Sequence, residues 1–279
     1  MTSAPIKYAY LGPSGTFTEA ALKKIAKVGD ELIPFANVTA ALDAVRAGAA
    51  DKALVPIENS VEGVVARTLD ELATGDALVV VAEETLPVSF SLMVLPENVG
   101  KPIRRIATHP HAEAQCRTYI AREIPGAEMI ETPSTAAAAE GLSAGNWDAA
   151  IAAAIAAEKF GLEIIASDIG DNQGAVTRFV LVEKPGAQTQ STGHDRTSLV
   201  AFIGKDHAGA LLEILTEFAN RSVNLSFIHS RPTGRGLGDY HFIIDVEGHI
   251  QDPGVHDAIE AVRAICEDIR LLGSYHRVD

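Results

Sequence analysis

Short apolar runs alternate with stretches of helical periodicity in the first two thirds of the chain. The apolar runs are bounded by Gly, Pro and polar residues and predict strands over residues 6–11, 52–56, 78–81, 88–95, 105–108, 164–166 and 176–182. The stretches between them predict helices over residues 17–26, 39–47, 64–73, 111–122, 134–144 and 149–160. This alternation predicts an α/β fold with largely parallel sheets, in which ligands bind beyond the carboxyl ends of the strands.

The last third of the chain has a shorter pattern of its own. It predicts strands over residues 198–203, 223–229, 239–246 and 271–275, and helices over 209–220 and 254–269. This βαββαβ order is that of a ferredoxin-like unit. Before it, residues 183–196 contain no large apolar side chain and are rich in Gly, Gln, Ser and Thr, which is typical of a linker. We therefore expect one domain over residues 6–183, a linker over 184–196 and a second domain over 197–279.

Composition and charge argue against several classes of function. The 279 residues include 37 acidic and 23 basic side chains, and the net charge of −14 repels the phosphate backbone of nucleic acids. No apolar run approaches the roughly 20 residues that span a membrane, and the N-terminus lacks the pattern of a signal peptide. Cys116 and Cys266 form neither a disulfide framework nor a metal-ligand spacing. These features favour a cytoplasmic protein that binds neither nucleic acid nor membrane.

Two glycine-containing segments at strand ends are candidate ligand sites. The segment GPSGTFTE (12–19) follows the first strand, and its glycines and hydroxyls suit an anion at a helix N-terminus. A plain tight turn, with Thr16 or Thr18 as the helix N-cap, explains the same residues. In VPIENSVEG (55–63), Asn59 and Ser60 either donate to a ligand carboxylate or cap the helix that is predicted from Val64.

Two further segments combine polar residues with a predicted element. In GDNQGAVTRF (170–179), strand alternation places Thr177 and Phe179 on one face and Arg178 on the other, where it pairs with a carboxylate or lies at the surface. In THPHAEAQC (108–116), His109 and His111 flank a proline that suits the first position of a helix. A metal site or a cysteine nucleophile is disfavoured there, and we expect a helix start that faces a cleft.

Taken in order, these motifs resemble the prephenate dehydratase family. The segments GPSGTFTEAAL, VPIENSVEGVV, THPHAEAQC and VTRF carry the resemblance, which runs from about residue 8 to 275. The C-terminal unit is similar to the ACT regulatory domain of that family through GALLEIL (209–215), Asn224-Leu225 and IHSRP (228–232). The chain departs from the family pattern at His229, where glutamate is usual, and histidine titrates near neutral pH.

The resemblance implies an activity, a fold and a set of site residues. It implies conversion of prephenate to phenylpyruvate, water and carbon dioxide, without metal or cofactor, and feedback regulation by L-phenylalanine bound between ACT domains of a homodimer or a dimer of dimers. It implies two lobes like those of type II periplasmic binding proteins, the second over about residues 86–165. Thr177 is implied as catalytic, and the implied substrate-binding residues are Ser14, Thr16, Glu58, Asn59, Ser60, Arg178 and Phe179. The implied effector-binding residues are Gly209, Ala210, Leu211, Asn224, Leu225, His229, Ser230 and Arg231.

Two other functions remain open at this point. An arogenate dehydratase performs the same chemistry on the amino-acid analogue, and the difference lies in whether the site meets a keto or an ammonium group. A non-catalytic amino-acid sensor has the same domains but does not need a donor for a leaving group. The intact TRF and ENS segments favour an enzyme.

Overall fold

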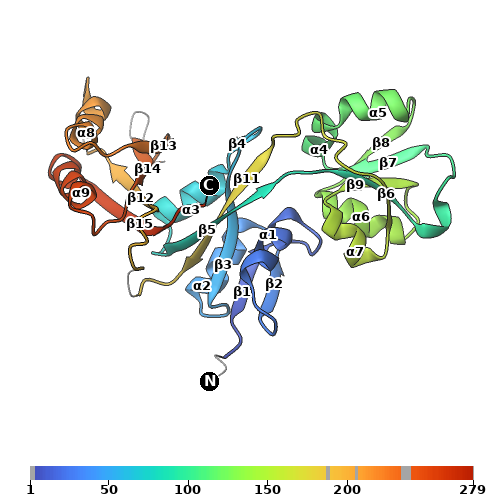
Figure 1. The fold of residues 1–279 in the computed structure, drawn as a ribbon, viewed down its shortest axis with the longest axis horizontal. Helices are drawn as coiled ribbons and strands as arrows, with labels where there is room; N and C mark the ends of the chain where they lie inside the picture. The colour runs from blue at the N-terminus through green and yellow to red at the C-terminus, as the bar shows by residue number, and fades with distance from the viewer. Residues whose placement is uncertain (1–3, 187–188, 205–206, 234–239, 279) are drawn as a thin grey trace. The chain divides into compact units, whose positions relative to one another are not determined.

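The first of three sheets in the computed structural model forms the centre of the N-terminal region (Figure 1). The structure describes residues 4–186, 189–204, 207–233 and 240–278. The strands of this sheet lie in the order β2-β1-β3-β11-β5, with β4 beside β3. They are β1 (Lys7–Leu11), β2 (Glu31–Phe35), β3 (Lys52–Asn59), β4 (Gly63–Val64), β5 (Val79–Pro87) and β11 (Val176–Glu183). The helices of this region are α1 (Phe17–Ile25), α2 (Val38–Arg46) and α3 (Ala66–Thr74).

The chain leaves this sheet through β5 and returns to it through β11, and the residues between them form a second lobe. Its strands, in the order β10-β6-β9-β7-β8, are β6 (Ser91–Val94), β7 (Arg105–Thr108), β8 (Glu128–Glu131), β9 (Ala149–Ala152) and β10 (Glu163–Ala166). Its helices are η1 (Pro96–Asn98), α4 (Pro110–Gln115), α5 (Arg117–Glu123), α6 (Thr135–Ser143) and α7 (Ala154–Phe160). Strand β7 is parallel to β8 and β9, whereas β6 is antiparallel to β9 and β10. The expected two-lobed α/β fold is therefore present, but this sheet is mixed rather than parallel.

The alanine-rich segment 149–160 was predicted as one helix, and this prediction is wrong for its first four residues. They form the central strand β9, and only Ala154–Phe160 is helical. Alternate β9 residues fill two cores: Ala150 packs with helices α6 and α7, and Ile151 packs on the opposite face of the sheet. Alanine has the highest helix propensity, so its side chain gives no sign of a buried strand.

The C-terminal region forms the predicted βαββαβ unit. Its antiparallel sheet has the order β13-β14-β12-β15, with β12 (Asp195–Phe202), β13 (Leu225–Pro232), β14 (Tyr240–Glu247) and β15 (Asp268–His276). Helices α8 (Ala210–Ala219) and α9 (Pro253–Ile265) pack on one face over a core that includes Ile214, Phe218 and Ile259. The helix predicted over 254–269 is too long, because its last residues belong to β15. Asp239, the predicted first residue of β14, lies outside the described residues.

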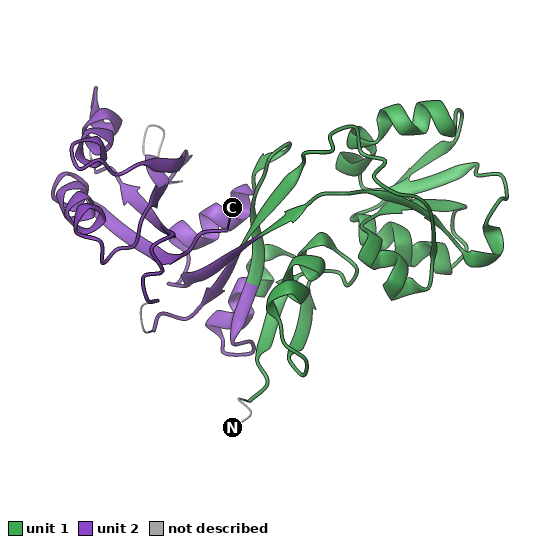
Figure 2. Cartoon of the chain, in the orientation of Figure 1, with its two compact units in different colours: residues 1–41, 54–64, 85–179 green, residues 42–53, 65–84, 180–279 purple. Residues whose placement is uncertain are grey.

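The chain divides into two compact units that cut across the predicted domains (Figure 2). Unit 1 contains residues 1–41, 54–64 and 85–179, and unit 2 contains residues 42–53, 65–84 and 180–279. Within unit 2, Arg196 of β12 forms a buried ion pair with Glu83 of β5. Strand β15 also passes close to β5, since a Cβ atom on Gly273 would overlap the carbonyl oxygen of Val80. The C-terminal sheet is therefore packed directly on strand β5.

Other differences from the predicted elements have local causes. The strands Glu31–Phe35 and Glu128–Glu131 were missed because both begin with glutamate and the first contains a proline. The helix predicted over 111–122 is broken at Cys116 into α4 and α5. The last two residues of the predicted linker, 195 and 196, begin β12 with buried polar side chains. Among the described residues, the helices are too short or too polar to cross a membrane.

Candidate active site

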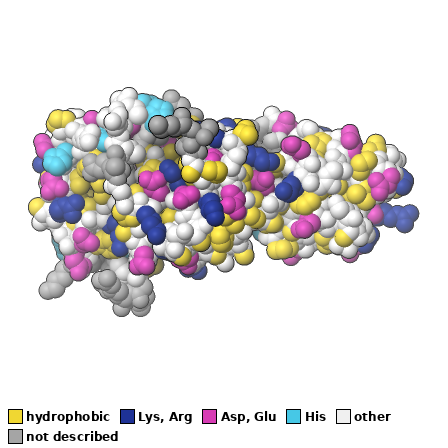
Figure 3. All heavy atoms as spheres, turned by 90° about the horizontal axis from the view of Figure 1, so that it is seen from below, with side chains coloured by type: hydrophobic (Ala, Val, Ile, Leu, Met, Phe, Trp, Pro, Cys, Tyr) yellow, Lys and Arg dark blue, Asp and Glu magenta, His cyan; other side chains and the backbone are white. Residues whose placement is uncertain are grey.

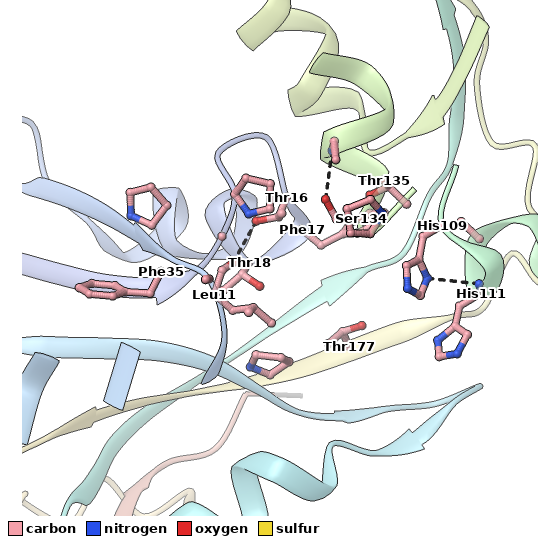
Figure 4. A pocket seen from close by; sticks show the side chains of 18 of the residues that line it. Leu11, Thr16, Phe17, Thr18, Phe35, His109, His111, Ser134, Thr135 and Thr177 are labelled. Carbon is pink, nitrogen blue, oxygen red and sulfur yellow. Dashed lines mark hydrogen bonds between the residues drawn. The ribbon is translucent and has the colours of Figure 1, made fainter. Parts of the chain in front are cut away.

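A cavity of about 740 Å³ in unit 1 is lined by residues of both lobes. Figure 4 shows the first turn of α1, the first turn of α6 and the segment that contains His109 and His111 around Thr177. The lining residues are Leu11, Gly12, Pro13, Thr16, Phe17, Thr18, Pro34, Phe35, Ala36, Pro56, Phe90, His109, His111, Ala112, Gln115, Pro133, Ser134, Thr135, Ala137, Thr177 and Phe179. The expected helix start that faces a cleft is thus found at Pro110.

The turn before α1 presents Thr16 to this cavity. Thr16 is the N-cap of α1, as one interpretation of its sequence predicted: its Oγ1 accepts from the backbone N–H of Glu19 at 3.4 Å and donates to the carbonyl of Leu11 at 3.2 Å. The buried Glu19 carboxylate accepts from the backbone N–H of Gly15 at 2.6 Å and so holds the turn closed. The N-terminal turn of α1 therefore faces the cavity with a fixed geometry.

Ser14 is placed in the same turn but away from the cavity lining. Its hydroxyl forms a hydrogen bond with Tyr10 Oη at 3.1 Å, and Tyr10 also donates to Glu19 at 3.2 Å. Burial chiefly raises the pKa of Tyr10 to about 12, so this phenol stays protonated as a donor. In this structure Ser14 supports the turn from behind.

Asn59 and Thr177 meet at the cavity wall. The Asn59 amide nitrogen donates to Thr177 Oγ1 at 2.8 Å. Asn59 Oδ1 accepts from the backbone N–H groups of Val61 and Glu62, at 2.8 and 2.9 Å, and this settles which end of the amide faces Thr177. Since the Thr177 oxygen already accepts a hydrogen bond, its own O–H is available to an acceptor in the cavity. Asn59 thus orients the hydroxyl of Thr177.

Ser60 joins the same turn to strand β11. Its backbone N–H donates to the carbonyl of Val176, and its Oγ accepts from the N–H of Val176, both at 2.9 Å. The alternative in which Asn59 or Ser60 caps the following helix is wrong, because α3 begins at Ala66 without a side-chain cap. A short strand, β4, intervenes between the turn and the helix.

The alternation predicted for the TRF segment is confirmed. Thr177 and Phe179 line the cavity, whereas Arg178 does not. The Arg178 side chain is only 10% exposed, and its Nε lies 3.5 Å from the Glu58 carboxylate. Glu58 and Arg178 therefore face each other across the neighbouring strands β3 and β11, away from the cavity lining.

Sequence reasoning missed the contribution of Ser134 and Thr135 to the cavity. Ser134 is the N-cap of α6 and accepts from the N–H of Ala137 at 3.0 Å, and Thr135 follows it in the lining. The N-cap pattern was visible in the sequence, but no local signal places this helix opposite α1. His109 Nδ1 accepts from the N–H of His111 at 3.3 Å, and burial together with His111 lowers the pKa of His109. Because Nδ1 accepts, the ring proton lies on Nε2, which is a donor.

The implied effector residues lie at three places of the C-terminal sheet and helices. Gly209 is the N-cap of α8 with a φ of 97°, and Ala210 and Leu211 form the first turn. Asn224 precedes β13, and Leu225 begins it. In the described sheet β13 pairs only with β14, so its other edge is open.

The end of β13 separates the remaining three effector residues by face. His229 stacks near Phe227 with ring centroids 6.3 Å apart, whereas Ser230 points to the more exposed face. Arg231 donates from Nε and Nη2 to the two carboxylate oxygens of Asp70 in α3, at 2.8 and 2.7 Å. The Arg231 side chain is thus hydrogen-bonded to helix α3 of the N-terminal region.

Comparison with known proteins gives a family for this geometry. The prephenate dehydratase family matches residues 8–187, and the ACT domain family matches residues 198–264. The chain belongs to the prephenate dehydratase family. The prephenate dehydratase of Amycolatopsis methanolica is 46% identical over 274 residues, which cover 98% of this chain and 89% of the relative.

Solved structures show the same fold over almost the whole chain. The crystal structure of prephenate dehydratase from Arthrobacter aurescens in complex with L-Phe has a TM-score of 0.90 and 49% identity, with 98% of this chain and 90% of that chain covered. A protein described as a novel type of quorum-quenching acylase has a TM-score of 0.85 and 29% identity, with 98% of both chains covered. Because one fold carries two described activities, the function must be argued from the site.

Proposed function

We propose that this chain is a prephenate dehydratase, which converts prephenate to phenylpyruvate, water and carbon dioxide. The observation that carries the proposal is the hydrogen bond from Asn59 to Thr177 Oγ1, because it leaves the Thr177 O–H for an acceptor in the cavity. Dehydration requires a donor at the leaving oxygen, and Thr177 is the proposed group. We do not propose Thr177 as a nucleophile. A nucleophilic hydroxyl needs a base that accepts its proton, whereas Asn59 donates a hydrogen bond to Thr177 Oγ1.

The reaction is an elimination that makes the ring aromatic. The bond between the ring and its carboxylate breaks, its electron pair enters the ring, and the carbon–oxygen bond at the 4-hydroxyl breaks at the far side of the ring. The oxygen leaves as hydroxide, and a proton taken from solvent converts it to water. A threonine hydroxyl is a weak acid, so Thr177 donates a hydrogen bond to the developing charge and does not supply a free proton. Positioned donors of this kind contribute about 10²- to 10⁴-fold in rate.

The substrate is a dianion, and the cavity offers two helix N-termini to hold it. The first turns of α1, at Thr16, and of α6, at Ser134 and Thr135, both line the cavity. The N-terminus of a helix attracts anions through free backbone N–H groups and the helix dipole. We assign one carboxylate to each turn, with Phe179 against the ring. This adds Ser134 and Thr135 to the substrate-binding residues and leaves Arg178 and Glu58 as supports of the strand pair.

The surface charge supports local rather than long-range attraction of this substrate. The net charge is −14, and Figure 3 shows acidic and basic side chains interspersed over the face in view. A negative protein does not steer a dianion toward itself. The helix N-termini and polar side chains of the cavity must therefore provide the binding energy.

The C-terminal βαββαβ region is the proposed regulatory domain. When it binds L-phenylalanine, the enzyme is inhibited. The complex of the Arthrobacter aurescens relative with L-Phe supports this role. We place the effector between Gly209–Leu211, Asn224–Leu225 and His229–Arg231 of two copies, because the open edge of β13 is available for pairing. A homodimer, or a dimer of dimers, follows from this arrangement.

Domain limits and location complete the proposal. We assign residues 6–183 to the dehydratase domain, 184–194 to the linker and 195–279 to the regulatory domain, because residues 195 and 196 already belong to strand β12. The two free cysteines are shielded from solvent to different degrees, and burial raises the pKa of Cys116 to about 12 and of Cys266 to about 11, so both stay as unreactive thiols. A cytoplasmic location suits this cysteine usage.

Formation of phenylpyruvate from prephenate by the purified chain tests the proposal. We expect turnover at neutral pH without added metal or cofactor. Binding of prephenate without any product would contradict the proposal and favour a sensor.

A further inference from the structure

Glu62 connects the two lobes at the cavity. It lies in the turn between β3 and β4, and its Oε1 accepts from Gln115 Nε2 of α4 at 2.9 Å. Its Oε2 lies 3.6 Å from His111 Nδ1. Both partners line the cavity and belong to the second lobe, whereas Glu62 belongs to the first.

The same turn also orients the hydroxyl of Thr177, which is the proposed catalytic group in strand β11. The backbone N–H of Glu62 donates to Asn59 Oδ1 at 2.9 Å, and the amide nitrogen of Asn59 donates to Thr177 at 2.8 Å. One residue therefore joins two sets of contacts: its side chain binds α4, and its backbone fixes the amide that orients Thr177. A shift of α4 away from the cavity would pull on the turn that sets the direction of the Thr177 O–H.

We propose that Glu62 is a positioning residue that links closure of the cavity to the orientation of Thr177. With Gln115 bound to Glu62 and His111 beside it, the second lobe is held over the substrate while Asn59 orients the hydroxyl. Without these contacts, substrate still meets the helix N-termini, but the hydroxyl and the ring are no longer held in one geometry. The inference rests on the proposed dehydratase function.

The exposure of these groups argues for a role in geometry rather than in stability. The side chains of Glu62 and His111 are 38% and 66% exposed. Exposed ion pairs contribute little to folding because water screens them. Small displacements at a reacting centre nevertheless change rates strongly, since catalysis depends on alignment. We therefore expect substitution of Glu62 to change kcat and to leave the melting temperature unchanged.

The test compares Glu62→Ala and Glu62→Gln with the wild type on prephenate. We expect Glu62→Ala to lower kcat about 10-fold with a smaller change in KM. Glu62→Gln should keep most of the activity, because its amide still accepts from Gln115. Glu97→Ala, at an exposed glutamate of the second lobe outside the cavity lining, is the control and should match the wild type.

A double variant separates positioning from direct substrate binding. If Glu62 acts through the Asn59 turn, Glu62→Ala should cost much less in an Asn59→Ala background than alone. Wild-type kcat in Glu62→Ala, an equal loss in both backgrounds, or a loss explained by a lower melting temperature would each overturn the inference. A wild-type chain that does not turn over prephenate would instead overturn the proposed function, and the inference with it.

Discussion

At the scale of the residue, the proposed chemistry depends on the direction of one hydroxyl group. Thr177 is 9% exposed and accepts from Asn59, so its O–H has few directions other than the cavity. Asn59 is in turn fixed by two backbone N–H groups. The hydroxyl is therefore oriented before substrate arrives, which avoids a cost of reorganisation during the reaction.

Replacement of Thr177 should separate its chemistry from substrate binding. Thr177→Ala should lower kcat by about 10²- to 10⁴-fold, because the donor at the leaving oxygen is lost, while KM and the fold change little. Thr177→Ser retains the hydroxyl and should retain most of the turnover. Steady-state kinetics on prephenate, with melting curves as the control for folding, measures both effects. Near wild-type turnover in Thr177→Ala would remove this residue from the mechanism.

The sequence allowed these residues to be named, but not all of their roles. Strand alternation correctly placed Thr177 and Phe179 on one face and Arg178 on the other. Successive side chains of any strand point to opposite faces, so this prediction does not depend on the tertiary structure. The role of Glu62 could not be predicted, because its partner Gln115 lies on the other lobe. Long-range contacts of this kind depend on how two separate sheets pack, which no local pattern encodes.

At the scale of the element, helix α3 contacts the C-terminal sheet and follows the β3–β4 turn along the chain. Arg231 binds Asp70 in the middle of α3, and Arg270 of β15 donates to the carbonyls of Leu72 and Gly75 at its end. The helix begins directly after β4, which pairs with Glu58 and Asn59 of β3. These contacts predict that α3 follows any movement of β13 on effector binding.

Breaking the Arg231–Asp70 pair should weaken regulation more than activity. Asp70→Asn removes the carboxylate that accepts both hydrogen bonds from Arg231. We therefore expect the L-phenylalanine concentration for half inhibition to rise about 5-fold or more. Uninhibited kcat should stay close to that of the wild type. Asp76→Asn, at an exposed carboxylate just beyond α3, is the matched control. Unchanged inhibition in Asp70→Asn would show that the pair does not carry the coupling.

Element types were largely predictable, and the error in the central strand of the second lobe has a tertiary cause. The βαββαβ unit and most helices of the first region follow from periodicity. The strand at Ala149 was missed, because two cores bury alternate alanines that have no strand signature of their own. Tertiary burial overrode the local propensity there.

At the scale of the whole molecule, the proposed regulation requires more than one copy of the chain. The proposed effector residues lie at the N-terminus of α8 and along β13, whose outer edge is open in the described sheet. An open edge is a natural site for pairing with a second copy. Binding of the effector between copies would couple assembly and inhibition by mass action.

Titration with L-phenylalanine should therefore change both activity and assembly. We expect inhibition of prephenate turnover together with a tighter or larger oligomer, measured by sedimentation at several protein concentrations. L-Alanine, which lacks the aromatic ring, is the control ligand. Inhibition without any change in assembly would contradict binding between copies, and the absence of both effects would contradict regulation through this domain.

The most direct measurement is the ratio of kcat/KM for prephenate and arogenate with the purified wild-type chain. The two substrates differ only in a keto and an ammonium group, so the ratio reports which one the cavity accepts. The account predicts phenylpyruvate formation from prephenate with a ratio well above one. No phenylpyruvate from prephenate, or a clear preference for arogenate, would contradict it.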